Sequence, residues 1–101
     1  MGPADSETVS FPGSMKAGMY TAQIGVSLVV SRETVTVKSF WRTVSIDRQN
    51  LVGLADTSLL GIFKRGIRFL HRQPGVPGRV VFYPYFSREQ VRQKLAELGW
   101  S

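Results

Sequence analysis

Apolar residues alternate with polar ones through the middle of the chain, and this period of two constrains the fold more than any other feature. Successive side chains of a strand point to opposite faces, so such alternation is typical of a strand with one buried side. Two groups of this kind flank the short polar stretch 31–33: Val26, Leu28 and Val30, then Val35, Val37 and Trp41. They predict a β-hairpin that buries all six side chains.

Further strands are expected on both sides of a polar turn at residues 47–50. Val44 and Ile46 alternate with polar residues before the turn, and residues 51–55 form a strand after it. Gly53 lies inside that strand, where a glycine often marks a bulge or bend in a curling sheet. Residues 62–72 are the longest strand candidate. One face carries Ile67, Phe69 and His71, and the other carries Arg68, Leu70 and Arg72.

The C-terminal third predicts one more strand and then a capped helix. Residues 73–78 form a turn, and residues 79–86 form a strand that ends at Pro84 or lies at a sheet edge, because proline lacks an amide hydrogen. The start of the helix is marked by an N-cap, a capping-box partner and a hydrophobic staple: Ser87, Gln90, and Phe86 with Val91. Gly99 ends the helix, and Trp100 folds back on it. The apolar stripe, which must pack on the sheet, is Val91, Leu95 and Leu98.

Residues 1–15 are expected to be a flexible leader outside the fold, and residues 16–101 a single domain. The leader lacks the positive start and apolar centre of a signal peptide, and Gly13-Ser14-Met15 resembles a cloning junction of vector origin. The chain has 101 residues, of which 43% are hydrophobic and 20% charged, as in one small globular domain. No apolar run approaches the roughly 20 residues of a membrane-spanning helix.

This order of elements resembles the pleckstrin-homology-like fold in its small bacterial versions. The similarity rests on SLVVSRETVTVKSFWRTVSIDRQNLVGL and on GRVVFYPYFSREQVRQKLAELGW, and with the hairpin between them it covers residues 24–100. It implies an α+β, mainly β fold: a curled antiparallel sheet or partly open barrel of six to seven strands, closed by a C-terminal amphipathic helix. Residues 20–24 would supply the seventh strand. The basic motif of the phosphoinositide-binding members is not evident, which favours the members described as protein or peptide scaffolds.

Basic side chains gather in a stretch without acids. The formal net charge is +6, and residues 57–88 contain no Asp or Glu. A positive surface favours anionic partners. Arg68 and Arg72 lie on one face about 13 Å apart at about 3.3 Å per residue, which suits an extended surface better than one phosphate. An ordinary solvated face is the simpler interpretation. The candidate residues for contact with an anionic surface are Lys64, Arg65, Arg68, Arg72 and Arg79.

No pattern points to catalysis, a metal or a cofactor. The acids are scattered without paired spacing, and no Gly-x-Ser-x-Gly elbow accompanies His71. With no Cys and one His, the chain offers no thiolate or clustered-ligand metal site. The glycines match neither a phosphate loop nor a dinucleotide fingerprint. His71 is expected to be a partly buried histidine with satisfied hydrogen bonds, rather than a pH-sensitive anion contact.

The expected function is a non-enzymatic binding module of a bacterial cytoplasm. Its basic strand and loop would recruit an acidic protein partner or an anionic phospholipid surface at the inner face of the membrane. The alternative is a nucleic-acid-binding domain that uses the same arginines, with exposed Tyr83 and Tyr85 as stacking platforms. Peptide binding or self-association through a strand edge is a third option.

Overall fold

The computed structural model describes residues 8–59 and 64–100, including all side chains of these residues except those of Ser58, Leu59 and Lys64. Within these residues, seven strands and one α-helix follow in chain order: β1 (Val9–Ala17), β2 (Tyr20–Val30), β3 (Thr34–Lys38), β4 (Thr43–Asp47), β5 (Leu51–Leu59), β6 (Lys64–His71), β7 (Val80–Pro84) and α1 (Arg88–Glu97). A short 3-10 helix, η2 (Arg48–Asn50), joins β4 to β5 and occupies the predicted polar turn.

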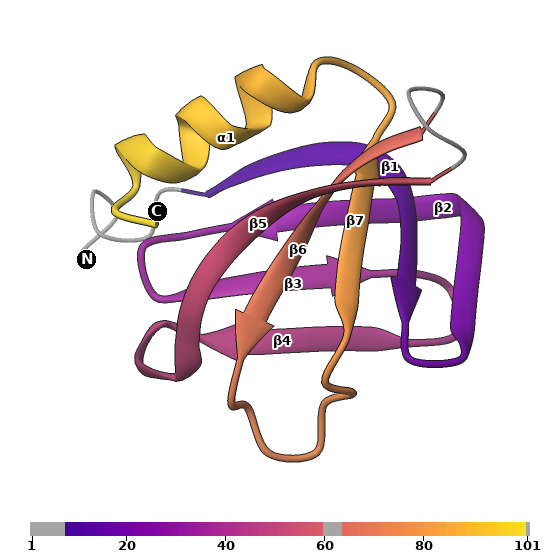
Figure 1. The fold of residues 1–101 in the computed structure, drawn as a ribbon, viewed down its shortest axis with the longest axis horizontal. Helices are drawn as coiled ribbons and strands as arrows, with labels where there is room; N and C mark the ends of the chain where they lie inside the picture. Colours follow the sequence, from indigo (N-terminus) through magenta and orange to yellow (C-terminus); the bar gives the residue numbers. More distant parts are fainter. Residues whose placement is uncertain (1–7, 60–63, 101) are drawn as a thin grey trace.

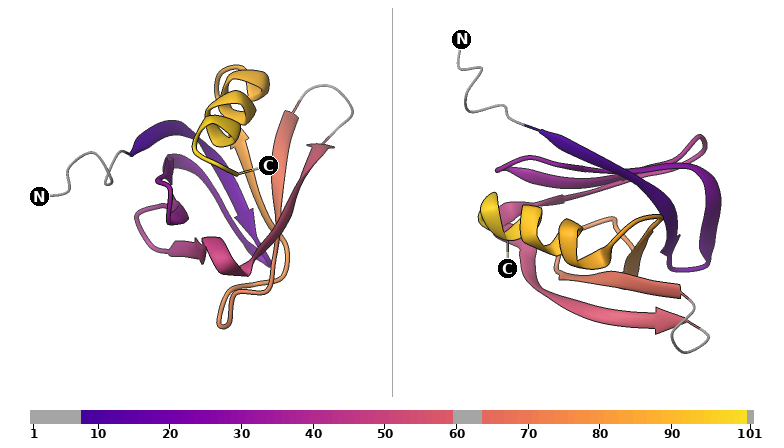
Figure 2. Two further views of the ribbon diagram at one scale, coloured as in Figure 1. Left: turned by 90° about the vertical axis from the view of Figure 1, so that its left-hand side faces the viewer. Right: turned by 90° about the horizontal axis from the view of Figure 1, so that it is seen from above.

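The strands form one antiparallel sheet in the order β4-β3-β2-β1-β7-β6-β5. The sheet curls into a half-barrel, and α1 lies over its open side (Figures 1 and 2). The predicted fold class, a mainly β curled sheet closed by one C-terminal helix, is confirmed.

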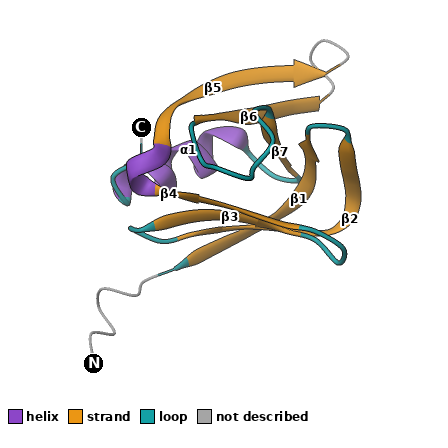
Figure 3. Ribbon diagram, turned by 90° about the horizontal axis from the view of Figure 1, so that it is seen from below, coloured by secondary structure: helices purple, strands orange, loops and turns teal. Residues whose placement is uncertain are grey.

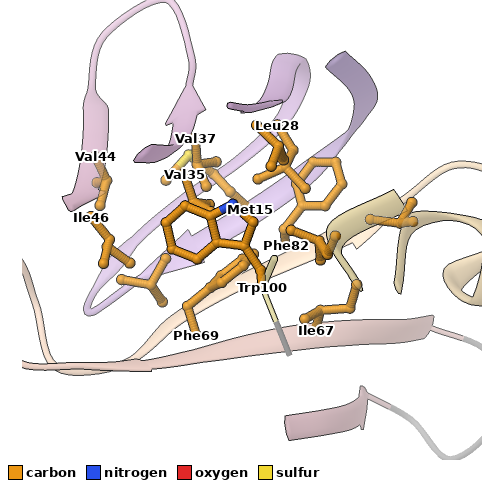
Figure 4. Close-up of a cluster of buried hydrophobic side chains, with 14 of the residues drawn as sticks. Met15, Leu28, Val35, Val37, Val44, Ile46, Ile67, Phe69, Phe82 and Trp100 are labelled. Atoms are coloured by element: carbon orange, nitrogen blue, oxygen red, sulfur yellow. The ribbon is translucent and has the colours of Figure 1, made fainter. Parts of the chain in front are cut away.

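The alternating apolar residues form the inner layer of β2, β3 and β4. Leu28 of β2 lies opposite Val37 of β3, and Val37 lies opposite Val44 of β4, so one side chain from each strand joins the same row. Figure 4 shows these side chains gathered around Trp100 and Phe69. The predicted inner residues of the three strands are all buried: Val26, Leu28, Val30, Val35, Val37, Val44 and Ile46.

Residues 9–15 belong to the fold, so the prediction of a leader that extends to residue 15 is wrong. Strand β1 lies between β2 and β7, and Met15 is buried in the core. At Gly13, β1 approaches β7 so closely that a Cβ would stand 2.4 Å from the Tyr83 carbonyl oxygen. The rest of the predicted leader, residues 1–7, lies outside the described residues.

The second half of the sheet contains the predicted bulge. The pairing of β5 with β6 shifts between Leu51 and Gly53, as expected for a glycine inside a strand. The longest strand is β2 with 11 residues and not β6 with 8, while Ile62 and Phe63 lie outside the described residues. Ile67 and Phe69 share a face as predicted, and that face is buried. The predicted end of β7 at Pro84 is confirmed.

Helix α1 begins and ends where the sequence predicts. The Ser87 hydroxyl oxygen accepts a hydrogen bond from the Gln90 backbone N–H at 3.3 Å. Gly99 follows the last turn with φ of +93°, a conformation that glycine adopts readily. Phe86 is exposed, so the predicted hydrophobic staple with Val91 is wrong.

The apolar stripe of α1 is buried in the core with Trp100. The backbone N–H of Trp100 donates to the Leu95 carbonyl oxygen at 2.8 Å, which folds the chain back on the helix. The indole N–H donates to the Ser31 carbonyl oxygen at 2.7 Å, between β2 and β3. The guanidinium of Arg48 lies over the indole ring at 4.9 Å from its centroid. The predicted packing of the helix on the sheet is therefore confirmed.

Candidate functional site

The basic residues predicted to contact an anionic surface do not form one group. Arg65 reaches toward α1, where its Nη2 lies 3.2 Å from Oε2 of Glu89. Arg68 points to the opposite, outer face of β6, because both of its sequence neighbours are buried in the core. The side chain of Lys64 lies outside the described residues. The strand thus divides the predicted set between its two faces.

The β6–β7 loop covers residues 72–79 (Figure 3). Arg72 and Arg79, at its two ends, are exposed. The backbone N–H of Arg72 donates to the Asn50 carbonyl oxygen at 2.8 Å. The Arg79 carbonyl oxygen accepts from the Gly18 N–H, in the β1–β2 turn, at 2.9 Å. The backbone at both arginines is therefore fixed to neighbouring segments, while their side chains extend into solvent.

His71 stabilises the start of this loop. Its Nδ1 accepts the Gln73 backbone N–H at 2.9 Å, so the ring proton that meets the Pro77 carbonyl oxygen at 2.8 Å is on Nε2. The neutral ring satisfies both contacts. The prediction of a partly buried, hydrogen-bonded histidine is confirmed.

The outer face of the sheet also carries Lys16, which is not among the predicted site residues. Lys16 of β1 and Arg68 of β6 both lie opposite Val81 of β7. Val81 is buried although it lies on the outer face, and the aliphatic stems of lysine and arginine are suited to cover such a residue. Nε of Arg68 is also covered and has no hydrogen-bond partner among the described residues. Lys16, Arg68, Arg72 and Arg79 are called the basic face below.

The ion pairs between described side chains gather on the helix side of the molecule. Residues of the basic face take part in none of them. The backbone N–H of Glu89, the Ser87 hydroxyl and the charges of Arg65 and Arg88 lower the pKa of the Glu89 carboxyl. The pairs are Arg65–Glu89, Arg88–Asp56, Arg88–Glu89, Arg92–Asp56 and Lys94–Glu97, with N···O distances of 3.0 to 4.0 Å.

The turn at residues 39–42 carries two exposed aromatic side chains. Trp41 is 89% exposed and Phe40 is 80% exposed, so the predicted burial of Trp41 is wrong. The cause is that β3 ends at Lys38 and the chain turns there, which interrupts the alternation. The Ser39 N–H donates to the Arg42 carbonyl oxygen at 2.9 Å, and the Ser39 Oγ accepts the Arg42 N–H at 3.1 Å.

This turn packs against the bend of β2, where the pairing of β2 with β1 shifts between Ala22 and Val26 (Figure 1). The hydroxyl of Tyr20 lies 2.8 Å from the Ser39 Oγ, and the Arg42 guanidinium lies 6.0 Å from the centre of the Tyr20 ring. The Phe40 ring lies against Gly25, where an added Cβ would stand 2.4 Å from a ring carbon. The turn therefore contacts β2 through Tyr20 and through Gly25.

Shallow grooves run along both sides of the Phe40 ring. One, of about 330 Å³, is lined by the first half of β2 and by Trp41; the other, of about 360 Å³, is lined by Ser27, Lys38 and their neighbours. Ile24, on the wall of the first groove, is largely exposed. Ile24, Phe40 and Trp41 are called the apolar ridge below.

The tyrosines proposed as stacking platforms have different environments. Tyr83 is only 6% exposed, and its ring lies over Gly66, where a Cβ would stand 2.6 Å from a ring carbon. The prediction of an exposed Tyr83 is therefore wrong. Tyr85 is exposed, and its hydroxyl donates to the Gln23 carbonyl oxygen.

Among the described residues, no group of three or more His, Cys, Asp or Glu side chains is placed to hold a metal ion. No helix in the described part of the chain has both the length and the apolar character needed to cross a bilayer. The sequence matches no protein-family model and no curated protein.

Proposed function

We propose that this chain is a non-enzymatic binding module of the pleckstrin-homology-like class, and that its basic face recruits an acidic partner. The partner is an anionic phospholipid surface or an acidic protein. The observation that carries the proposal is the separation of charge. Arg68, Arg72 and Arg79 form no ion pair with a described acid, whereas the described acids of β5 and α1 neutralise the basic residues of the helix side.

The spacing of the basic face supports contact with an extended surface. Lys16 and Arg68 are two strands apart, which is about 10 Å at about 4.8 Å per strand. Each such cation near an anionic membrane contributes about 1 kcal/mol. Four of them give a weak, salt-sensitive association. In this proposal the protein works in the bacterial cytoplasm, and at the inner face of the membrane when the partner is lipid.

Vesicle co-sedimentation with and without acidic lipid tests the proposal. Arg68→Glu and Arg72→Glu are each expected to weaken binding about tenfold or more, because each replaces an attraction with a repulsion. Arg32→Glu, in the β2–β3 turn, makes the same change in net charge away from the basic face and serves as the control. Because Nε of Arg68 is covered, Arg68→Gln and a thermal melt of each variant separate loss of charge from loss of fold.

Equal weakening by all three reversals would attribute the binding to net charge and not to the basic face. An acidic polypeptide such as polyglutamate, used as competitor, identifies a protein partner. Gel shift with single-stranded and duplex nucleic acid at several salt concentrations tests the remaining alternative. Tight binding with a steep salt slope there would replace the proposal with a nucleic-acid function.

A further inference from the structure

We propose that the apolar ridge inserts into the interface of an anionic lipid bilayer, so that the partner of this module is a membrane. The inference rests on the proposed function, because the basic face must first attract the anionic surface. It identifies the partner as a membrane and names the side chains that enter the membrane. Charge alone determines neither.

The two residues at the tip of the 39–42 turn belong to types that are uncommon in turns. Turns favour Gly, Pro, Asn, Asp and Ser, yet the two central positions here are Phe40 and Trp41. The hydrogen bonds that close the turn come from Ser39 and do not involve the aromatic rings. Large apolar side chains that a fold leaves together in solvent mark a contact surface.

The neighbouring segments add apolar side chains on the same side of the molecule. Ile24 is exposed at the bend of β2, and Met19 is fully exposed at the tip of the β1–β2 turn. Tyr20, directly after Met19, contacts Ser39 and so connects the two turns. Figure 1 shows both turns on the right-hand side, away from the yellow C-terminal end of α1.

Cations lie just behind each apolar tip. Lys38 precedes Phe40, Arg42 follows Trp41, and Lys16 precedes Met19 by a few residues. At about 3.3 Å per residue, these charges are set back by no more than about 10 Å. No acid occurs in residues 8–32 or 34–46, the segments that form this side of the sheet.

Apolar tips with cations set back behind them match a lipid bilayer better than they match a protein surface. Interfacial apolar side chains reach about 5–10 Å into the boundary between head groups and acyl chains, while cations remain at the level of the phosphates. Tryptophan is enriched at this depth, because its ring is apolar and its N–H can still meet water or head groups. An acidic protein would bring carboxylates to the level of Trp41 itself, and the projecting rings would require a matching pocket.

Contacts within the protein support the conformation of the turn before it meets a surface. Hydrogen bonds from Ser39 hold it on one side, and the contact of the Phe40 ring with Gly25 fixes the ring on the other. Insertion therefore requires no rearrangement of the turn backbone or of the Phe40 ring, which favours association.

Tryptophan fluorescence tests the proposal with the intact protein. The chain has two tryptophans, and Trp100 is buried, so changes in quenching on binding report on Trp41. The probes are vesicles of phosphatidylcholine alone and of phosphatidylcholine with phosphatidylglycerol. With the anionic vesicles, we expect a blue shift of the emission and a several-fold fall in acrylamide quenching. Trp41→Phe, which retains Trp100, is expected to show neither change.

A pair of variants measures the contribution of the ridge to affinity. Phe40→Ala with Trp41→Ala is expected to lower the affinity for anionic vesicles about tenfold, because the apolar area that enters the interface is lost. Phe86→Ala removes an equally exposed aromatic side chain beside α1 and is expected to leave the affinity unchanged. Equal effects of the two changes would overturn the proposal.

The outcomes separate this proposal from the function on which it rests. If anionic vesicles bind and Arg68→Glu weakens the binding while the Trp41 emission does not move, the basic face stands and insertion is overturned. If Trp41 responds to polyglutamate and not to vesicles, the partner is a protein and the membrane is overturned. If neither vesicles nor polyglutamate bind, both proposals fail.

Discussion

At the scale of single residues, two glycines make room for aromatic rings of β7. A Cβ on Gly13 would stand 2.6 Å from the Phe82 ring, and a Cβ on Gly66 would stand 2.6 Å from the Tyr83 ring. These contacts lie on opposite sides of β7, since Phe82 and Tyr83 are successive residues of that strand. Both glycines were visible in the sequence, but the rings that cover them come from distant positions. Their role therefore could not be predicted from local pattern.

Gly13→Ala is expected to destabilise the protein by about 1 to 3 kcal/mol, as overpacking in a core does. The added methyl meets the Tyr83 carbonyl oxygen, which belongs to the backbone and cannot move aside easily. Urea denaturation of the full chain measures the change. Gly78→Ala, where an added Cβ meets nothing within 4 Å, should stay within about 0.5 kcal/mol. Similar effects of the two substitutions would mean that β1 is not packed against β7.

At the scale of elements, α1 could be predicted from the sequence and β1 could not. The signals of α1 are local, and its cap, stripe and terminal glycine all lie where predicted. In β1 the triplet Gly13-Ser14-Met15 resembles a cloning junction and predicts a leader, and Pro12 and Gly13 are unusual residues for a strand. Pro12 is tolerated because β7 pairs with β1 only from Gly13 onward, and its carbonyl oxygen still accepts the Tyr85 N–H at 3.1 Å. Lys16 lies just inside the predicted domain, but its place on the outer face follows only from the strand alternation of β1, in which Met15 and Ala17 are buried.

The packing of α1 on the sheet is tested by Leu95→Ala. Leu95 is fully buried, so its truncation is expected to destabilise the protein by about 2 to 5 kcal/mol through lost contacts and the cavity left behind. Gln93→Ala, on the exposed side of the same helix, should change the stability by less than about 0.5 kcal/mol. Thermal or urea unfolding of both variants gives the comparison. A Leu95→Ala protein as stable as the parent would show that the helix does not dock.

Ion pairs connect α1 to β5, which is an edge strand of the sheet. Asp56 faces Arg92 at 3.1 Å and Arg88 at 3.7 Å, and Arg88 donates to the Thr57 carbonyl oxygen at 3.2 Å. Because Asp56 is about half exposed, Asp56→Asn should cost at most about 1 kcal/mol. We expect faster amide exchange along β5, while Glu97→Gln, at the far end of α1, leaves β5 unchanged. If amide exchange along β5 is unchanged in both variants, the ion pairs of Asp56 do not stabilise β5.

At the scale of the whole molecule, two surfaces differ in how far the sequence could predict them. The acid-free stretch 57–88 located Arg68, Arg72 and Arg79, because a run of one charge is visible without a structure. That Arg65 turns to α1 instead depends on its strand face and on the position of Glu89. The apolar ridge depends on the bend of β2 and on the end of β3, which bring Ile24 beside the 39–42 turn. Long-range placement of this kind leaves no mark in a local pattern.

The separation of charge predicts that vesicle binding depends more on the position of a cation than on the net charge of the protein. Arg68→Gln with Arg79→Gln removes two charges from the basic face, and Arg92→Gln with Lys94→Gln removes two from α1. Both pairs start from the same formal +6 and lose the same amount of charge.

At about 1 kcal/mol per cation near an anionic surface, the first pair should weaken vesicle binding about thirtyfold. The second pair should weaken it less than about threefold, because Arg92 and Lys94 are already paired with Asp56 and Glu97. In addition, α1 lies over the open side of the half-barrel and not on its outer face (Figures 1 and 2), so salt screens the interaction of these charges with the bound surface. Co-sedimentation at 0.15 M salt, with thermal melts of both doubles, measures the ratio; equal losses would show that the molecule binds through its net charge and has no preferred face.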